Sequence, residues 1–291
     1  MKHRLILIII KLLGRLPLPV GRGVGALVGR IMARSGSRGR AARVTRVNID
    51  LCFPELDAAE RERLAQKSLI ETGKVGAEMA AIWCRDEPCL RRHILGEQGA
   101  ELISHKLAQG RGLIVLTPHL GNWEAISLYA SRFGPITALY QPPKDAATDA
   151  FMISGRLKPN VKLAPTSRRG VTQLLKALRA GEMVGILPDQ VPDEGSGQVA
   201  PFFNQPALTM TLVHGLIART DCQVVMTFCE RIAGGFKVVV RECDPGIRDE
   251  NLDLALAALN RSVEDCVRLA PAQYQWEYKR FRTRCERDPY K

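Results

Sequence analysis

Short apolar runs alternate with amphipathic stretches over most of the chain after residue 100. Residues 112–117 (GLIVLT) form a wholly apolar run, typical of a strand buried on both faces, and 136–140 and 183–187 are similar runs. Between them, apolar residues recur at helical spacing over 122–133 and 171–179. This alternation of strand and helix predicts an α/β domain with helices on both faces of a sheet.

The pattern continues to residue 269. Helical spacing recurs at 208–219 and over the long segment 252–269. Between these helices, the runs 224–229 and 236–240 are joined by Ala-Gly-Gly at 233–235, which predicts an antiparallel hairpin. The sheet is therefore expected to be mixed, within a single α/β domain.

The first hundred residues have a different character. Residues 57–83 carry helical apolar spacing, with Asp57 placed to cap the helix, and a Ser/Gly/Arg stretch at 35–40 indicates a linker. We expect three parts: a basic membrane anchor over 1–34, a helical lead-in over 35–99 and the α/β core over 100–291.

Positive charge is concentrated at the start of the chain. The net charge is +12, and the first fifty residues hold eleven Lys or Arg and one acid, so ten of the twelve excess charges lie there. A basic surface spread over the whole chain would favour nucleic acid. A basic segment beside an apolar one favours an anionic membrane surface, where each Lys or Arg contributes ~1 kcal/mol. We therefore expect a membrane surface, and no nucleic acid, as a partner.

The apolar run at residues 5–13 (LILIIIKLL) indicates how that contact is made. No small-residue cleavage site follows it, and it is shorter than the ~20 apolar residues that span a bilayer. We expect an uncleaved anchor that lies in the cytoplasmic leaflet. A single span that extends to residue 28 stays open as the alternative.

The eight cysteines indicate neither a disulfide framework nor a metal site. None forms a Cys-x-x-Cys pair, and no Cys/His group has zinc-finger spacing. We expect reduced, mostly buried thiols and no bound metal.

The segment 117–124 (TPHLGNWE) is the sharpest candidate for chemistry. The apolar run before it brings His119 to the carboxyl end of a strand, where α/β active sites lie. Gly121 permits a tight turn, Asn122 is placed to cap the next helix, and Glu124 falls in its first turn. We expect Glu124 to hold one imidazole nitrogen and leave the other free as a base. No Gly-x-Ser-x-Gly elbow accompanies the pair, so the nucleophile would be a hydroxyl of the substrate.

Five segments together carry a resemblance to a known family. They are HLGNWE at 119–124, NIDLCFPE at 48–55, PDQ at 188–190, PFF with PALT within 201–209, and QWEYKRF at 275–281. With these segments in their order along the chain, residues 5–284 resemble the late acyltransferases of lipid A synthesis. That family has an H-x-x-x-x-D/E motif and belongs to the wider lysophospholipid-acyltransferase-like group. Asn204 stands where the family commonly has glycine, so the loop there is expected to differ.

The resemblance implies an activity and roles for further residues. It implies acyl transfer from acyl carrier protein, with acyl-CoA as the other candidate donor, to a hydroxyl of a lipid A precursor, without a metal or redox cofactor. The enzyme would act on the cytoplasmic face of the inner membrane, and we expect a monomer. Arg156 would assist at the developing oxyanion, which a fixed guanidinium stabilises. Asp189 would help shape the site, by holding Arg156 or the donor.

Several alternatives stay open. The same chemistry could act on a lysophospholipid, a glycolipid or an ornithine-type lipid. A metal hydrolase could use His119, Glu124 and Asp189, although it would lack a clear third ligand set. A basic membrane adaptor would leave the H-x-x-x-x-E motif unexplained. The aromatic and basic residues interleaved at 276–284 could stack on nucleic acid, but a membrane or carrier-protein contact is favoured there.

Overall fold

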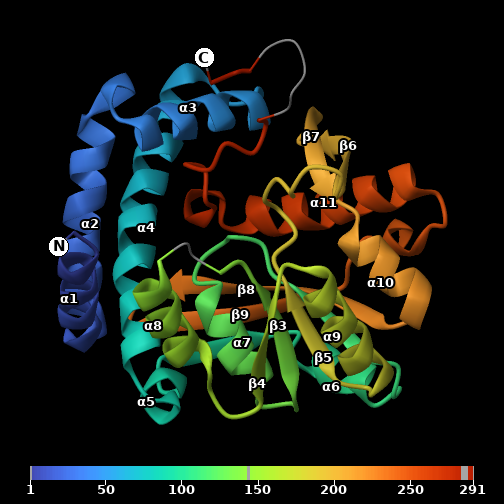
Figure 1. The fold of residues 1–291 in the computed structure, drawn as a ribbon. Helices are drawn as coiled ribbons and strands as arrows, with labels where there is room; N and C mark the ends of the chain where they lie inside the picture. Colours follow the sequence, from blue (N-terminus) through green and yellow to red (C-terminus); the bar gives the residue numbers. More distant parts are fainter. Residues whose placement is uncertain (1, 143–144, 283–287, 291) are drawn as a thin grey trace.

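One mixed sheet forms the centre of the molecule (Figure 1). The computed structural model describes residues 2–142, 145–282 and 288–290, without the side chains of 2–6, 37 and 146. Within these residues the sheet has seven strands in the order β1-β9-β8-β2-β5-β3-β4. The strands are β1 (Ile94–Gln98), β2 (Leu113–Leu116), β3 (Ile136–Tyr140), β4 (Val161–Pro165), β5 (Met183–Ile186), β8 (Gln223–Ile232) and β9 (Gly235–Arg241).

The strand directions and the burial of β2 explain the layered architecture. Strand β2 runs parallel to both β5 and β8, whereas β8 and β9 form an antiparallel hairpin, so the predicted mixed sheet is confirmed. Leu113 and Val115 belong to one buried cluster, and Ile114 and Leu116 belong to another. Because side chains alternate across a strand, both faces of the sheet are covered.

Helices cover the two faces. One face carries α6 (Glu101–Leu107) and α7 (Glu124–Ala130). The other carries α9 (Arg168–Arg179), α10 (Leu212–Thr220) and α11 (Leu252–Leu269), while α8 (Ala146–Arg156) joins β3 to β4. Three short 3-10 helices are η1 (Gly36–Arg38), η2 (Pro245–Arg248) and η3 (Pro271–Gln273).

Most of the elements predicted from the pattern are confirmed, and the exceptions are instructive. The strand at 136–140 and the helix at 252–269 have the predicted bounds. The helix predicted over 208–219 is wrong at its start, because residues up to 210 belong to β7 (Gln205–Met210), which pairs with β6 (Gly197–Phe202) in a separate hairpin. Strand β1 belongs to the sheet although it lies within the predicted lead-in, so the sheet begins earlier than residue 100.

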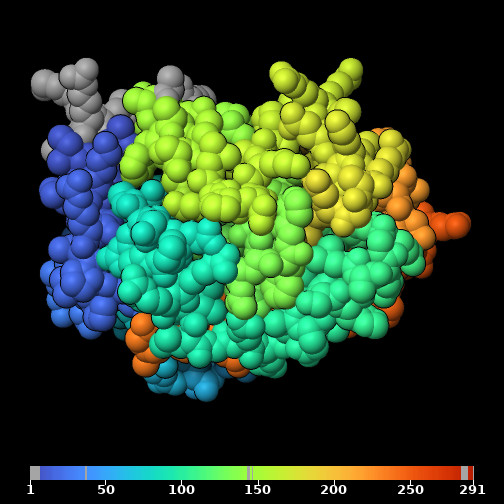
Figure 2. All heavy atoms as spheres, turned by 90° about the horizontal axis from the view of Figure 1, so that it is seen from below, coloured from blue at the N-terminus to red at the C-terminus, as the bar shows by residue number. Residues whose placement is uncertain are grey.

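The N-terminal helices form one flank of the molecule, drawn in blue beside teal α4 in Figures 1 and 2. They are α1 (Lys2–Arg15), α2 (Leu18–Arg34) and α3 (Arg40–Cys52), followed by α4 (Ala58–Cys84) and α5 (Glu87–Arg91). The predicted Asp57 cap is confirmed, and with Glu60 it forms a reciprocal capping box at the start of α4. Along the described chain, no helix has the length and apolar character that a bilayer crossing requires.

Helix α2 packs on α4 through glycines. A side chain at Gly25, Gly29 or Gly73 would overlap the backbone of the facing helix, so the two helices can approach closely only because these positions are glycine. The opposite side of α1 and α2 is apolar and exposed: Ile8, Ile9, Leu12, Val20, Val24, Leu27, Val28 and Ile31 are each 40–60% exposed. A large exposed apolar surface of this kind marks an interaction surface.

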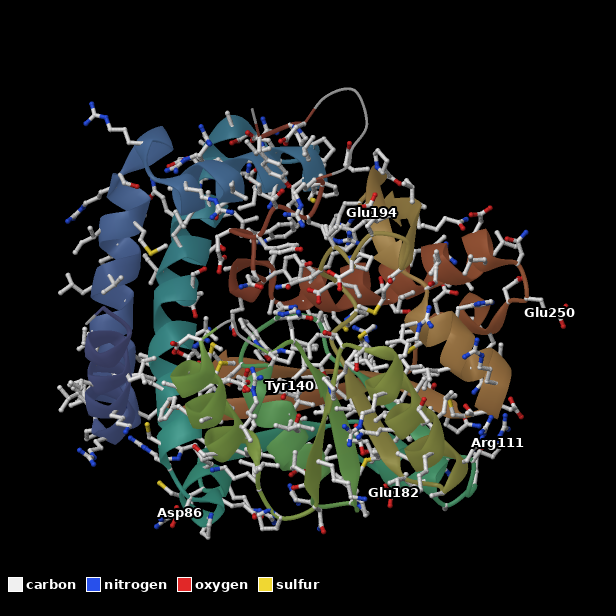
Figure 3. The ribbon with its side chains drawn as sticks, viewed as in Figure 1. Asp86, Arg111, Tyr140, Glu182, Glu194 and Glu250 are labelled. Carbon is white, nitrogen blue, oxygen red and sulfur yellow. The ribbon has the colours of Figure 1, made fainter. Side chains whose placement is uncertain are left out.

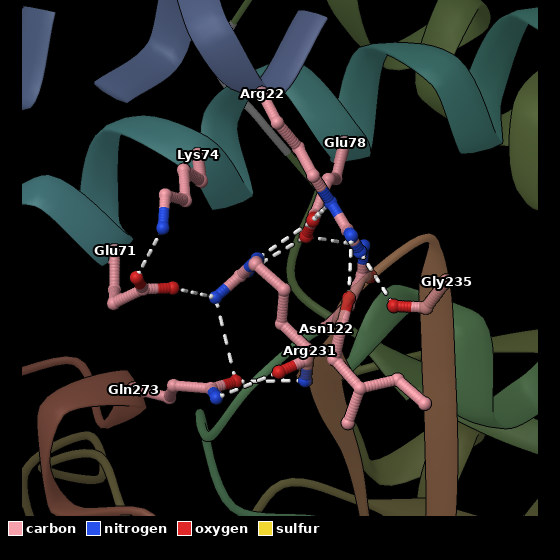
Figure 4. A network of polar contacts seen from close by, with 9 residues as sticks. Arg22, Glu71, Lys74, Glu78, Asn122, Arg231, Gly235 and Gln273 are labelled. Atoms are coloured by element: carbon pink, nitrogen blue, oxygen red, sulfur yellow. Dashed lines mark hydrogen bonds and ion pairs between the residues drawn. The ribbon is translucent and has the colours of Figure 1, made fainter. Parts of the chain in front are cut away.

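A buried ion-pair network ties α2 to the sheet (Figure 4). Arg22 of α2 donates to Glu78 of α4 (2.5 Å) and to the backbone carbonyls of Ile232 and Gly235 (2.7 Å each) at the turn of the β8–β9 hairpin. Arg231 of β8 donates to both carboxylate oxygens of Glu78 (2.6 Å each). The N-terminal helices are thus joined to the α/β core by paired buried charges as well as by packing.

Candidate active site

The loop that carries His119 leaves β2 at the carboxyl edge of the sheet and is held closely on both sides. Gly121 has φ +62°, and a Cβ there would overlap the carbonyl of Cys229 on β8. The next amide, of Asn122, donates to that same carbonyl (2.7 Å). The prediction that Asn122 caps α7 is wrong. Its side chain is buried and donates to Glu78 (3.3 Å), and Trp123 occupies the N-cap position.

His119 is paired with Asp189. The imidazole Nδ1 lies 2.8 Å from Oδ1 of Asp189, and the backbone N–H of His119 donates to Oδ2 (2.9 Å). The two residues occupy equivalent places on neighbouring parallel strands. Leu116 pairs with Ile186 in the β2–β5 ladder, and each catalytic candidate follows three residues later (119 − 116 and 189 − 186). Because Nδ1 faces a carboxylate, it carries the proton, and Nε2 is left to exchange one.

Burial alone would raise the pKa of Asp189. The charge of His119 and the hydrogen bonds from its ring and backbone, together with one from Tyr274, outweigh burial and hold that pKa below its ordinary value. The carboxylate is therefore ionised at neutral pH, as the partner of a base must be when the imidazole takes up a second proton.

Glu124 holds Arg156 and not His119. Its Oε2 accepts from Nε of Arg156 (2.9 Å) and from the indole nitrogen of Trp83 (2.9 Å), and its Oε1 accepts from Nη2 of Arg156. The prediction that Glu124 holds an imidazole nitrogen of His119 is therefore wrong, because Asp189 takes that place. Glu124 begins α7, where its carboxylate faces Trp83 on α4 and Arg156 at the end of α8, while the neighbouring strand brings Asp189 to the imidazole.

A cavity of about 1080 Å³ joins these groups. His119, Glu124 and Arg156 line it, whereas Asp189 is buried behind the imidazole. Tyr140 ends β3 and also lines the cavity, and Figure 3 shows it at the edge of the sheet opposite Glu182, which precedes β5. The remaining wall is mixed. Its apolar residues include Ile82, Leu128, Leu139, Leu163, Leu175 and Met210, and its charged residues include Lys158, Arg168, Asp193 and Arg219.

At about 1080 Å³ the cavity lies just above the ~300–1,000 Å³ of common small-molecule sites, so it has room for a long chain that reaches the polar centre. A base, its orienting carboxylate and a fixed guanidinium are the parts needed to activate a hydroxyl and stabilise a developing oxyanion. No group of three or more His, Cys, Asp or Glu side chains in the described part of the chain is placed to hold a metal ion.

The family model for bacterial lipid A biosynthesis acyltransferase matches residues 2–283 of the sequence. The chain belongs to this family. The acyltransferase is 29% identical over 289 residues to the lipid A biosynthesis lauroyltransferase of Escherichia coli (strain K12), in an alignment that covers 94% of this chain and 89% of that protein. It is 27% identical over 274 residues to the palmitoleoyltransferase of the same organism (93% and 87%) and 24% identical over 273 residues to its myristoyltransferase (91% and 83%). The names of these relatives specify three different acyl chains.

The structure changes one sequence-based interpretation and confirms another. Three residues of the aromatic and basic segment near the C-terminus of the acyltransferase are buried and are not available for stacking on a partner: Trp276 is 1%, Arg280 2% and Phe281 4% exposed. Arg282 is exposed, and Arg284 lies outside the described residues. The cysteines of the described residues carry free thiols, and burial raises the pKa of several of them, including Cys52 and Cys229. Cys285 lies outside the described residues.

Proposed function

We propose that this acyltransferase moves a fatty acyl chain from the thioester of acyl carrier protein to a hydroxyl of a lipid A precursor, with His119 as the general base. The observation that carries the proposal is the His119–Asp189 pair at a large cavity with many apolar lining residues, beside an arginine fixed by a carboxylate. The family supports a lipid A precursor as the acceptor.

In the proposed reaction, Nε2 of His119 takes the proton of the acceptor hydroxyl, while the oxygen of that hydroxyl attacks the carbonyl carbon of the thioester. The C–O bond forms, and the negative charge that develops on the carbonyl oxygen is stabilised by Arg156, which Glu124 holds in place. The C–S bond then breaks, and the imidazolium returns its proton to the leaving thiolate. Asp189 keeps the imidazole in the required tautomer and stabilises its charged form.

The exposed apolar side of α1 and α2 supports a location at the cytoplasmic face of the inner membrane. The exposed side chains project away from α4, and Arg30 and Arg34 on α2 are available for anionic head groups. Attachment would be peripheral or monotopic. The acceptor would enter the cavity from the side of α4 and α8, which lies next to these helices.

A series of variants tests the mechanism. We expect His119→Ala to abolish transfer and Asp189→Asn to lower kcat by about 10²- to 10⁴-fold, the range of general base catalysis. Glu124→Gln should act through Arg156 and cost less than Asp189→Asn. Full activity of purified, folded His119→Ala would refute the proposal, and a harmless Asp189→Asn with an inactive Glu124→Gln would reverse the roles of the two carboxylates.

The acceptor is tested by mass spectrometry of lipid A from a strain without this gene. The missing mass would identify both the acyl chain and the acylated precursor. Unchanged lipid A would instead direct the search to a lysophospholipid, glycolipid or ornithine-type lipid.

A further inference from the structure

One short segment touches both halves of the His119–Asp189 pair. This segment, residues 273–278, begins at the last residue of η3, after α11, and runs along the loop that carries His119. The amide of Gly121 donates to the carbonyl of Gln273 (3.0 Å), and the amide of Gln275 donates to the carbonyl of His119 (3.0 Å). Leu120 and Tyr274 form an isolated antiparallel bridge between them.

The side chains of the same segment hold the loop after Asp189. Gln190 donates from Nε2 to Oε1 of Gln275 (3.0 Å), and the amide of Val191 donates to the hydroxyl of Tyr278 (3.0 Å). The backbone of the segment therefore binds the base's loop while its side chains bind the loop of the orienting carboxylate. The His119–Asp189 pair itself also joins these two loops.

The segment is itself anchored by groups buried behind it. Asn48 of α3 is fully buried and donates from Nδ2 to the carbonyls of Trp276 (2.6 Å) and Tyr278 (2.7 Å). The ring of Phe53 packs edge-on against that of Trp276 at 5.6 Å. The sequence segments 48–55 and 275–281 thus meet in space, behind the pair that the segment 273–278 holds.

We infer that residues 273–278 form a positioning strap for the acyltransferase, in which Tyr278 and Gln275 set the geometry between Asp189 and His119. The inference rests on the proposed roles of that pair. Neither side chain is assigned contact with substrate. The Tyr278 hydroxyl accepts a hydrogen bond from the Val191 amide. Removal of this hydroxyl lets the Asp189 loop move relative to the base, and small misplacements of catalytic groups lower the rate strongly.

The test compares Tyr278→Phe with a matched control. Ser262→Ala also removes a buried hydroxyl that accepts a loop amide, that of Asp244 (2.8 Å), but at a place remote from the cavity. Assays use whichever of lauroyl-, myristoyl- and palmitoleoyl-acyl carrier protein turns over fastest, with lipid A precursor as acceptor. One net hydrogen bond corresponds to about a tenfold change, so we expect Tyr278→Phe to lower kcat about tenfold with each KM within twofold. Ser262→Ala should keep kcat within twofold despite a similar loss of thermal stability.

A spectroscopic readout separates positioning from general destabilisation. The Nδ1 proton of His119, held against Asp189, should give a downfield proton NMR signal in the full-length protein that is absent from His119→Ala. Tyr278→Phe should broaden or shift this signal, and Ser262→Ala should not. If Tyr278→Phe is poorly folded, Gln275→Ala is expected to lower kcat and change the signal in the same way, because it removes the link to Gln190 together with a side-chain hydrogen bond to Glu277.

An unchanged kcat and an unchanged signal in folded Tyr278→Phe or Gln275→Ala would overturn the positioning role. That outcome is distinct from a failure of the proposed mechanism, in which His119→Ala would itself remain active.

Discussion

Replacing Arg22 by methionine tests whether the N-terminal helices are an integral part of the folded enzyme. The Arg22 side chain is only 12% exposed, and its partner Glu78 is fully buried. Methionine keeps most of the apolar stem but removes the charge. Glu78 then has a single guanidinium partner, Arg231, and the carbonyls of Ile232 and Gly235 each lose a charged donor.

The magnitude follows from these contacts. Removing one member of a buried ion pair costs about 3–5 kcal/mol. Because Arg231 still compensates Glu78, we expect the lower part of that range, about 3–4 kcal/mol. For a protein larger than 150 residues each kcal/mol shifts the melting temperature by roughly 2–4 °C, so Arg22→Met should lower it by roughly 6–16 °C.

Thermal unfolding followed by circular dichroism, in detergent at one scan rate, measures the change. Arg30→Met is the matched control, because Arg30 lies on the same helix but is exposed, and it should shift the melting temperature by no more than about 2 °C. The second replacement Glu78→Gln should not recover the loss in Arg22→Met, since it takes from buried Arg231 the carboxylate that its Nε and Nη2 contact. Equal melting temperatures for Arg22→Met and Arg30→Met would refute the reasoning and make the N-terminal helices a loosely attached anchor.

Two further substitutions test the active-site loop and the membrane surface. Gly121→Ala should abolish activity and lower stability, because the added Cβ would overlap the Cys229 carbonyl. Gly110→Ala should keep activity, because Gly110 also has a positive φ (+69°) but faces open space; equal effects of the two substitutions in a transfer assay would contradict this. Leu27→Ser with Ile31→Ser should weaken co-sedimentation with anionic phospholipid vesicles, and Leu95→Ser, exposed on β1, should not; unchanged binding of the double variant would remove α2 from the membrane contact.

Much of the fold follows from the local pattern of the sequence. The apolar run before His119 forms β2 with all four residues buried, and the hairpin signal at 233–235 joins β8 to β9. Asp57 caps α4 because capping depends on residues within one turn. The failures occur where a distant partner decides. Residues 208–210 are a strand because they pair with β6, and Asn122 turns away from α7 because Glu78 lies within reach.

The sequence alone also places His119 and Asp189 at the carboxyl ends of strands and Glu124 in the helix that follows, whereas Arg156 comes only from the family resemblance. It does not determine which carboxylate meets the imidazole, because that depends on strand order. Only the tertiary structure places β5 beside β2, so that Asp189 meets His119 at a matching register position. It also places α8 next to α7, so that Arg156 pairs with Glu124. Hydrogen bonds act over about 3 Å, so pairing follows proximity in space, and proximity between segments 70 residues apart is set by the sheet and not by spacing along the chain.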